Sequence, residues 1–383
     1  MKTLKRFLLL SLIAGVTFLA SCEKDDEVDK MSYEEGKQAL ENMDAQMASD
    51  LDAMTNSEGM AAIATLQGMP DPFASATKRN KETQVVSNIR SFLLPGIDKE
   101  RLKSTEGASF DFSGHTGTYT WIDSLQRWEI IPGDPSDKII INFPADSTNM
   151  DNNNATLTLH EYQEDTIPGD FIDDYYPTRI LADLTIDGTK YMGLDVTAVW
   201  NEYGEPVDFG VSVFLKPFTF TASMTNEETA ASIDLSIDYD GDEIFSTGMN
   251  ATFMTDSMQN PKVIEGYLQY RTVRIDALVN AENITAMIEE MQSGQTSYTD
   301  QEIFDQINSE IDAYISSDGE KIADIKVGTV TNPETSQQEI GVLLVFGDGT
   351  EENAQPYFDN FSQKLEAFFN NIGIQLEDTY NIQ

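Results

Sequence analysis

The chain has 383 residues, with 66 acidic against 24 basic side chains and a formal net charge of −42. This charge argues against nucleic-acid binding, which needs Lys and Arg to displace counterions, and against electrostatic attachment to anionic membranes. Hydrophobic residues make up 40% of the chain and aromatic residues 10%, so the chain can bury a folded core and does not have a disordered composition.

The first 21 residues have the pattern of a secretory signal peptide. Lys2, Lys5 and Arg6 precede an apolar run over residues 7–19. That run is too short to cross a hydrocarbon layer of roughly 30 Å as a helix. A basic start followed by a short apolar segment is therefore interpreted as a secretory signal rather than an anchor helix.

The only cysteine of the chain comes directly after the apolar run, in Leu19-Ala20-Ser21-Cys22. These four residues resemble the bacterial lipobox. The resemblance implies that the Cys22 thiol carries diacylglycerol and that its freed amine carries a further acyl chain, which together give stable membrane attachment. The rest of the chain then has no thiol for a disulfide, a metal or covalent catalysis. An ordinary signal peptide with a chance cysteine is the alternative.

An acidic stretch, EKDDE at residues 23–27, follows the cysteine. Lys24, Asp25 and Asp26 resemble the export signal of Bacteroidota lipoproteins, a lysine followed by acidic residues. The resemblance implies delivery to the outer face of the outer membrane. A solvated acidic tether over residues 22–32, on a protein that stays on the periplasmic face, is the alternative.

A helix is predicted from Tyr33, because apolar residues recur there at intervals of three and four. They are Leu40, Met43, Met47, Leu51 and Met54. This methionine-rich stripe is typical of a core-facing surface, and a pliable binding surface is the alternative. The pattern stops at residues 70–72, and a second short helix is predicted over residues 85–93.

After Gly107 the hydrophobic period changes from 3.6 to 2, which predicts a long succession of strands. Their ranges are 117–122, 127–131, 138–143, 155–163, 179–186, 189–200, 206–224, 230–239, 243–254 and 263–279. The connections are short, and Asp187-Gly188 and Asp240-Gly241 are favoured hairpin turns. Sequential strands are therefore expected to pair antiparallel, as a meander.

The strand predicted over residues 206–224 changes its apolar face in the middle. Its apolar residues occupy odd positions from 207 to 215 and even positions from 218 to 224. One buried face can continue across Lys216-Pro217 only with a one-residue slip, so we expect a bulge or sharp bend there. Long strands bent in this way favour a curved sheet.

Helices are predicted again at 281–292 and at 300–316, and the second begins with the capping box Thr299-x-x-Glu302. Strands at 321–330 and 338–347 and a final helix over 358–372 complete the chain.

The sequence therefore predicts an α+β fold, a long curved antiparallel meander packed against N-terminal and C-terminal helices. Its expected divisions are a signal peptide at 1–21, a tether at 22–32, a helix-plus-meander domain at 33–279 and a helical and β lobe at 280–383. The order of elements, with the anchor, resembles LolA-type and lipocalin-like envelope lipoproteins. That resemblance implies a cavity between sheet and helices.

Sequence motifs for catalysis are weak. His160-Glu161 begins the stretch HEYQE, which differs from the zinc-protease motif His-Glu-x-x-His only in its last residue, Glu164. The surrounding alternation predicts a strand, on which four residues span about 13 Å, so His160 and Glu164 cannot share one ion. His115 lies in a glycine-flanked turn with no Gly-x-Ser-x-Gly elbow to pair with. Paired carboxylates leave a glycan hydrolase open as an alternative.

Acidic residues also gather at one predicted turn. Asp238, Asp240 and Asp242 are weak calcium candidates there, because calcium prefers oxygen ligands. Gly241, however, comes too early for an EF-hand, and Asp-Gly is already explained as a hairpin turn. We therefore predict no metal and no cofactor.

Trp121, Trp128, Trp200 and Tyr175-Tyr176 are candidates for a sugar-stacking platform. Trp121 and Trp200 fall on strand patterns, however, so burial is the favoured interpretation. The sequence as a whole predicts a non-catalytic, surface-anchored lipoprotein that binds an extracellular or envelope ligand. A carrier of lipid or other apolar molecules is the alternative. The expected partners are a membrane, through the acyl chains, and a lipid or glycan ligand.

Overall fold

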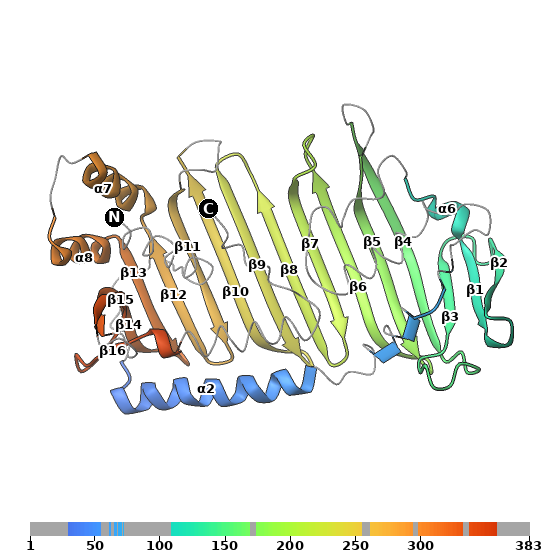
Figure 1. The fold of residues 1–383 in the computed structure, drawn as a ribbon, viewed down its shortest axis with the longest axis horizontal. Helices are drawn as coiled ribbons and strands as arrows, with labels where there is room; N and C mark the ends of the chain where they lie inside the picture. The colour runs from blue at the N-terminus through green and yellow to red at the C-terminus, as the bar shows by residue number, and fades with distance from the viewer. Residues whose placement is uncertain are drawn as a thin grey trace. The chain divides into compact units, whose positions relative to one another are not determined.

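The computed structural model contains sixteen strands and a few short helices among its described residues (Figure 1). The strands form a predominantly antiparallel sheet, which confirms that part of the predicted fold class. The described residues are 30–54, 61–62, 65–66, 68–70, 72, 109–168, 174–254, 261–293, 298–331 and 337–357. The predicted signal peptide, the lipobox, most of the tether, the helix at 85–93 and the final helix at 358–372 lie outside these ranges.

The chain divides into two compact units, which we describe one at a time. The first unit contains the described residues up to Asp50, residues 226–237 and the described residues from Glu243 onward. The second contains those from Leu51 to Thr225, with residues 238–242. The division at residue 279 that the sequence suggests stays a prediction.

The second unit holds the strands β1 to β8. Hydrogen bonds place them in the order β8-β7-β6-β5-β4-β3-β1-β2. Their bounds are β1 (Gly117–Ile122), β2 (Arg127–Pro132), β3 (Ile139–Phe143), β4 (Ala155–Ile167), β5 (Asp174–Ile186), β6 (Thr189–Trp200), β7 (Pro206–Leu215) and β8 (Phe218–Asn226). A short helix, α6 (Phe112–His115), precedes β1, and a 3-10 turn, η1 (Asp123–Leu125), joins β1 to β2.

Alternating side chains build the core of the second unit. Strand β3 alternates buried and half-buried residues, and Ile139 and Phe143 are fully buried. The same alternation on β5 and β6 adds Ile180 and Val196 to one continuous cluster. Such period-two burial is what a half-covered strand produces, which explains why the sequence pattern located these strands well.

Strand β3 departs from the expected meander. It pairs parallel with β1, with Gly117 opposite Ile139, while β2 pairs antiparallel on the other side of β1. The connection after β2 therefore crosses to the far side of β1. The prediction that all sequential strands pair with one another is wrong at this point, because a short connection limits distance but does not decide on which side of a strand the chain returns.

The predicted bulge at Lys216-Pro217 is also corrected. Leu215 pairs directly with Phe218, so these two residues form a hairpin turn and the predicted long strand is two strands, β7 and β8. Val213 then faces Phe220 across the hairpin. The apolar residues change from odd to even positions because the chain reverses here. Residues that pair across a two-residue turn have numbers that differ by an odd amount, as Leu215 and Phe218 do.

The first unit holds the remaining strands, whose hydrogen-bonded order follows the chain from β9 to β16. Their bounds are β9 (Ala230–Tyr239), β10 (Asp242–Phe253), β11 (Pro261–Tyr270), β12 (Val273–Val279), β13 (Ile311–Ser317), β14 (Glu320–Thr331), β15 (Gln338–Phe346) and β16 (Glu351–Asn353). The pairs from β10 to β16 are all antiparallel.

Two further predictions are corrected in the first unit. The strand expected over 263–279 is a hairpin, because Tyr270 pairs with Val273 across a turn at Arg271-Thr272. The helix expected over 300–316 ends early: α8 covers Asp300–Ser309, and strand β13 follows at once. The Glu310 N–H bonds the Ile307 carbonyl and closes the helix.

Among the described residues of the first unit there are three helices: α2 (Tyr33–Met54, of which residues 33–50 belong to the unit), α7 (Ala281–Ser293) and α8. The predicted capping box of α8 is confirmed, since Thr299 and Glu302 bond each other's backbone N–H groups. Met287 of α7 and Ile303 and Ile307 of α8 form a small apolar cluster. None of the described helices has an apolar stretch long enough to cross a bilayer.

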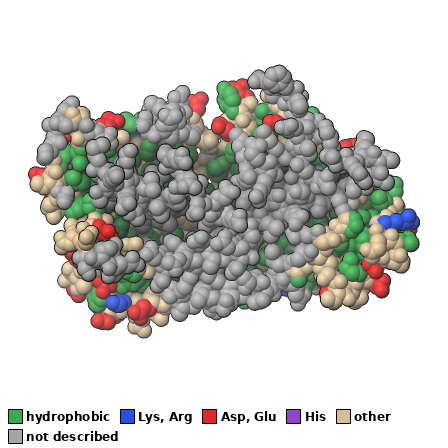
Figure 2. All heavy atoms as spheres, viewed as in Figure 1, with side chains coloured by type: hydrophobic (Ala, Val, Ile, Leu, Met, Phe, Trp, Pro, Cys, Tyr) green, Lys and Arg blue, Asp and Glu red, His purple; other side chains and the backbone are tan. Residues whose placement is uncertain are grey.

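Acidic side chains dominate the charged surface. On the face drawn in Figure 2, described acidic side chains are scattered widely and basic ones appear at only a few points. This distribution agrees with the net charge of −42.

Candidate functional site

A groove lies in the first unit between α2 and the ends of two neighbouring hairpins, and we call it the α2 groove. Its volume is about 480 Å³, which falls within the usual range of ligand sites. One wall is formed by the β11–β12 and β13–β14 turns and the other by α2. The lining residues are Met31, Glu35, Gln38, Ala39, Asn42, Met43, Gln46, Tyr270, Arg271, Thr272, Val273, Ser317 and Asp318.

Arg271 occupies an unusual position in the hairpin wall. Its φ is +51°, in the left-handed region, where a residue with a long side chain costs roughly 1–2 kcal/mol. The first residue of the β13–β14 turn, Asp318, has a similar φ of +52°, and Gly319 follows it, as such turns prefer. An arginine kept at a position that favours Asn, Asp or Gly is a strained residue, and strain of this kind clusters at functional sites.

Hydrogen bonds hold the two turns side by side. The Asp318 N–H donates to the Thr272 carbonyl at 3.1 Å, and the Ser317 hydroxyl donates to the Thr272 hydroxyl at 3.3 Å. The Arg271 N–H donates to the carbonyl of Ile244 at 3.0 Å. The hairpin wall is therefore braced from both neighbouring strands, which gives the groove one rigid side.

The helical wall is mainly polar. Gln38, Asn42 and Gln46 recur every fourth residue on α2 and are exposed, and they reach the groove together with Glu35. Glu35 belongs to a capping box with Ser32, whose N–H and hydroxyl both donate to it, and these bonds lower the pKa of Glu35. Most side chains that line the groove can form hydrogen bonds, which suits a polar ligand.

A cluster of four side chains, the Glu352 latch, holds the start of α2. Tyr33 and Tyr357 donate hydroxyl hydrogen bonds to Glu352, the latter at 2.6 Å, and the Lys37 ammonium lies 3.3 Å from the same carboxylate. Burial alone would raise the pKa of Glu352, but these bonds together lower it. Burial, then the bond to Glu352, raises the pKa of Tyr357 to about 12.

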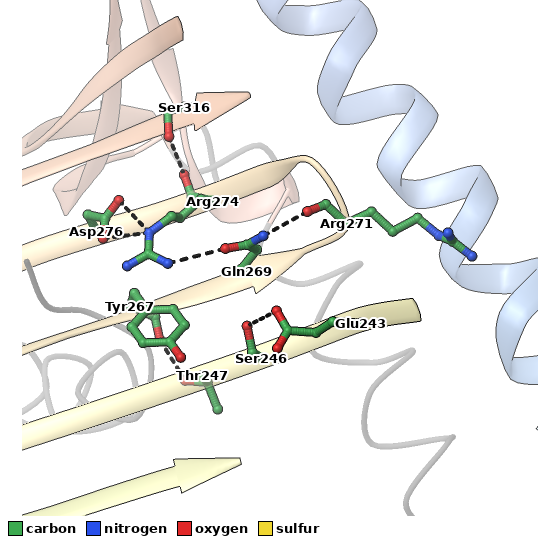
Figure 3. A network of polar contacts seen from close by, with 9 residues as sticks. All are labelled: Glu243, Ser246, Thr247, Tyr267, Gln269, Arg271, Arg274, Asp276 and Ser316. Carbon is green, nitrogen blue, oxygen red and sulfur yellow. Dashed lines mark hydrogen bonds and ion pairs between the residues drawn. The ribbon is translucent and has the colours of Figure 1, made fainter. Parts of the chain in front are cut away.

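Close to the groove, one face of the sheet carries a set of polar contacts centred on Arg274, the Arg274 network (Figure 3). The Arg274 Nε donates to both oxygens of Asp276, at 2.9 and 3.0 Å. Its guanidinium also lies 3.9 Å from the centroid of the Tyr267 ring. A planar cation stacked on an aromatic ring is well suited to hold a carboxylate in a poorly solvated place.

Asp276 is the buried acid of this network, with 7% of its surface exposed. Burial raises its pKa, and the charge and hydrogen bonds of Arg274 offset only part of that rise. Burial, followed by the charge of Asp276, also raises the pKa of the neighbouring Tyr314. A buried acid with a raised pKa is a candidate for catalysis, but ion-pair networks that only support a fold produce the same shift.

The Arg274 network reaches the groove through Gln269. The Gln269 side chain accepts a hydrogen bond from Arg274 at 3.2 Å and donates one to the Arg271 carbonyl at 3.0 Å. In Figure 3 the Arg271 side chain extends from the turn toward α2. We therefore assign the network a supporting role: it fixes the strained turn from which Arg271 reaches the groove.

The aromatic rings of this face do not form a sugar platform. Arg274 covers Tyr267, and the Lys321 ammonium lies 5.1 Å from the ring centroid of Tyr314. In the groove, Tyr270 is only 3% exposed. Rings covered by cations or buried in a sheet leave little aromatic surface on which a pyranose could stack.

The predicted lipidation and export residues, Leu19, Ala20, Ser21, Cys22, Lys24, Asp25 and Asp26, lie outside the described residues and stay predictions. Asp238, Asp240 and Asp242 lie around the β9–β10 turn, where Asp240 has a φ of +53°. Within the described part of the chain, no three acidic, His or Cys side chains gather as metal ligands would. The structure thus adds no support for calcium at this turn.

His160 lies on β4, which confirms the strand predicted there, and its Nε2 is 3.3 Å from an Asp183 oxygen. His115 ends α6. Trp121 is 2% exposed, which confirms its predicted burial. Trp200 packs 4.8 Å from Tyr176, measured between ring centroids.

Arg271, the main residue of the groove, was missed by sequence reasoning, although a signal was present. The apolar residues change parity between Tyr270 and Val273, as they also do across Lys216-Pro217, and in both places this change marks a hairpin.

Comparison with known proteins found no matching family model, no matching curated protein and no matching solved structure.

Proposed function

We propose that this protein is a non-catalytic lipoprotein that is anchored through acylated Cys22 and binds a polar ligand in the α2 groove. The observation that carries the proposal is the groove itself. Polar side chains line it, and one of them, Arg271, is kept in a backbone conformation that penalises it. Lys24, Asp25 and Asp26 support delivery to the cell surface, and the periplasmic face of the outer membrane is the alternative location.

The short stretch of chain between Cys22 and the groove supports a ligand site close to the membrane anchor. Lys30 forms a parallel bridge to Lys321, and the Met31 N–H donates to the Lys321 carbonyl at 2.9 Å. Met31 also lines the groove. A fully extended chain covers at most about 3.6 Å per residue, so the eight steps from Cys22 to Lys30 reach about 29 Å. An acylated Cys22 would thus keep the groove within reach of components at the membrane surface.

A carrier of lipid or other apolar molecules is the second candidate from the sequence. It would need a curved sheet that encloses apolar space together with its helices. The α2 groove differs from such a cavity, because carboxylates, amides, hydroxyls and a guanidinium lie along it beside its apolar atoms. An apolar ligand would leave those groups without hydrogen bonds, which is costly. We therefore favour a polar ligand.

Native mass spectrometry of the full-length protein, extracted in detergent from its own host, tests this proposal. We expect a bound polar molecule in the wild type and its loss in the double variant Gln38→Leu/Gln46→Leu. Glu41→Gln is the control, because Glu41 is an exposed residue of α2 outside the groove. A lipid retained in addition to the Cys22 acyl chains would favour the carrier, and a polar ligand that persists in the double variant would place its site elsewhere.

A further inference from the structure

We infer that the edge strand β2 of the second unit pairs antiparallel with β2 of a second copy of this chain, about a two-fold axis at Trp128. The inference concerns a surface that the proposed function does not use. It is independent of the α2 groove and of the proposed anchor.

Strand β2 is the last strand of the sheet, and among the described strands only β1 pairs with it (Figure 1). The Gly133 N–H donates to the Thr116 carbonyl at 2.8 Å, so these two residues form a hydrogen-bonded pair at the end of the β1–β2 ladder. Such pairs recur every second residue in an antiparallel ladder, so the main-chain groups of the odd-numbered residues of β2 point toward β1. Those of Trp128 and Ile130 therefore point outward and can bond another strand.

The side chains of β2 leave apolar surface uncovered on both faces of this edge. Ile130 and Ile131 point to opposite faces, because they are neighbours on a strand, and both are exposed. The Trp128 side chain is held in place: its Nε1 donates to the Pro70 carbonyl at 2.8 Å, and its ring centroid lies 5.3 Å from that of Trp121. A strand added beyond β2 would cover part of both isoleucines, and burial of apolar surface favours such an addition.

The charges of β2 indicate which strand fits there. Arg127 and Glu129 are exposed and come one residue before and one residue after Trp128, and neither has an ion-pair partner among the described residues. When two copies pair with Trp128 opposite Trp128, Arg127 of each copy lies directly opposite Glu129 of the other. Opposite charges in this position stabilise an antiparallel pair. The strand is thus complementary to itself in charge.

Other registers lack this complementarity. Outward-pointing main-chain groups must face each other, so the centre of a symmetric pairing can move only one residue at a time. A centre at Arg127 or at Glu129 would place like charges directly opposite each other, which is destabilising. A centre at Ile130 would place Glu129 opposite Ile131 and form no ion pair. Of these registers, the one centred on Trp128 is therefore favoured.

The net charge of −42 opposes self-association, so the attraction at the edge has to be local. At about 0.15 M salt the Debye length is about 8 Å, which limits the repulsion to charges near β2. Charged residues on an edge strand commonly prevent pairing with arbitrary strands. In β2 the two signs stand symmetrically about Trp128, so they admit a second copy and disfavour strands with another charge pattern.

Sedimentation equilibrium of the full-length protein, in density-matched detergent at about 0.15 M salt, tests the pairing. We expect a monomer–dimer equilibrium in the wild type. Arg127→Glu and Glu129→Arg should each weaken the dimer by about tenfold or more, because each replaces two attractive pairs with two repulsive ones. The double variant Arg127→Glu/Glu129→Arg should recover wild-type dimerisation within about threefold. Lys262→Glu is the control, since Lys262 is exposed and lies on β11.

Each result of this experiment decides the matter. A wild type that stays monomeric at all concentrations would overturn the inference, as would a dimer that neither single variant weakens. A double variant as weak as the single variants would overturn it too. Equal weakening by Lys262→Glu would show that net charge, rather than β2, controls association. The exposed side chains of β2 allow these exchanges without loss of the fold, and unchanged thermal unfolding checks this.

Disulfide trapping tests the register. Cys22 is the only cysteine, so in a full-length Cys22→Ser background each introduced cysteine is the only thiol. Residues directly opposite in a non-hydrogen-bonded pair have Cα atoms about 4.5 Å apart, which suits a disulfide. We expect a mixture of the Arg127→Cys and Glu129→Cys variants to form mainly mixed disulfide dimers on oxidation. Preferred cross-linking of either variant to itself would contradict the axis at Trp128.

Discussion

The Arg274 guanidinium lies between an aromatic ring and a buried acid: it is 3.9 Å from the centroid of the Tyr267 ring and donates to both oxygens of Asp276. Tyr267 in turn lies against Gly248, where a Cβ would be only 2.8 Å from the ring. The glycine makes room for the ring, the ring supports the cation, and the cation compensates the acid. Three strands, β10, β11 and β12, thus hold one charge pair in place.

Arg274→Met should lower the free energy of unfolding at pH 7 by about 1–2 kcal/mol, because it leaves Asp276 buried without its cation. The double variant Arg274→Met/Asp276→Asn should recover most of this loss, since no uncompensated charge remains. Urea denaturation of the wild type, both single variants and the double variant measures the coupling. Equal losses in the Arg274→Met variant and the double variant would contradict the pairing.

Asp276→Asn tests the pKa of the acid. Burial raises the pKa of Asp276 in the folded state, so the stability it contributes is fully present below the unfolded pKa of about 3.9 and is lost as pH rises through the folded pKa. The wild type should therefore lose stability relative to Asp276→Asn as pH rises from about 4 toward neutral. Unfolding curves over that pH range measure the difference. A wild type that instead gains stability relative to Asp276→Asn as pH rises would mean that Arg274 lowers the pKa of Asp276 more than burial raises it.

Glu352→Gln should loosen the start of α2, because Lys37 loses its counter-charge and the two tyrosines lose an anionic acceptor. We expect faster hydrogen exchange at residues 33–43 and a loss of about 1 kcal/mol in stability. The pKa of Glu352 is lowered in the folded state, so its contribution is present above the unfolded pKa and should disappear as pH falls below about 4. Exchange at pH 7 that matches the wild type would show that α2 is held by other contacts.

Gly36→Ala tests how closely α2 approaches the sheet. Alanine normally stabilises a helix interior by about 1 kcal/mol relative to glycine. At Gly36, however, a Cβ would be 2.6 Å from the Cγ2 of Ile322, and crowding of this kind costs about 1–3 kcal/mol. We expect a net loss of stability in thermal unfolding. Ile322→Ala should reverse the sign of the Gly36→Ala effect by removing the clash, and a stabilising Gly36→Ala in the wild type would contradict this packing.

Cys22→Ser tests the proposed anchor. Without the thiol the chain cannot accept diacylglycerol, so radiolabelled palmitate should mark the wild type and not the variant. The variant should also leave the membrane fraction, because acyl chains bind bilayers in proportion to their buried methylenes, about 0.8 kcal/mol each. A Cys22→Ser variant that stays membrane-bound, or a wild type without label, would contradict lipidation.

Much of the strand content could be predicted from local alternation. The sequence placed a strand at 189–200 and the structure has β6 at Thr189–Trp200, because one face of that strand is buried and period two follows directly. The Thr299 capping box was equally readable, since it involves residues only three apart. The errors at Lys216-Pro217 and Arg271-Thr272 concerned turns, where a reversal and a bulge change the apolar pattern in the same way.

The sequence alone determined the acidic character of the protein, the antiparallel class of its sheet and the position of most strands, because composition and periodicity are properties of neighbouring residues. It also contains the lipobox-like and export-like residues, which stay predictions. Only the tertiary structure decided that β3 lies parallel to β1 and that α2 and two hairpin turns line one groove with Arg271 in its wall. The groove joins segments that are far apart in the chain, and such contacts depend on how elements pack, which no local pattern records.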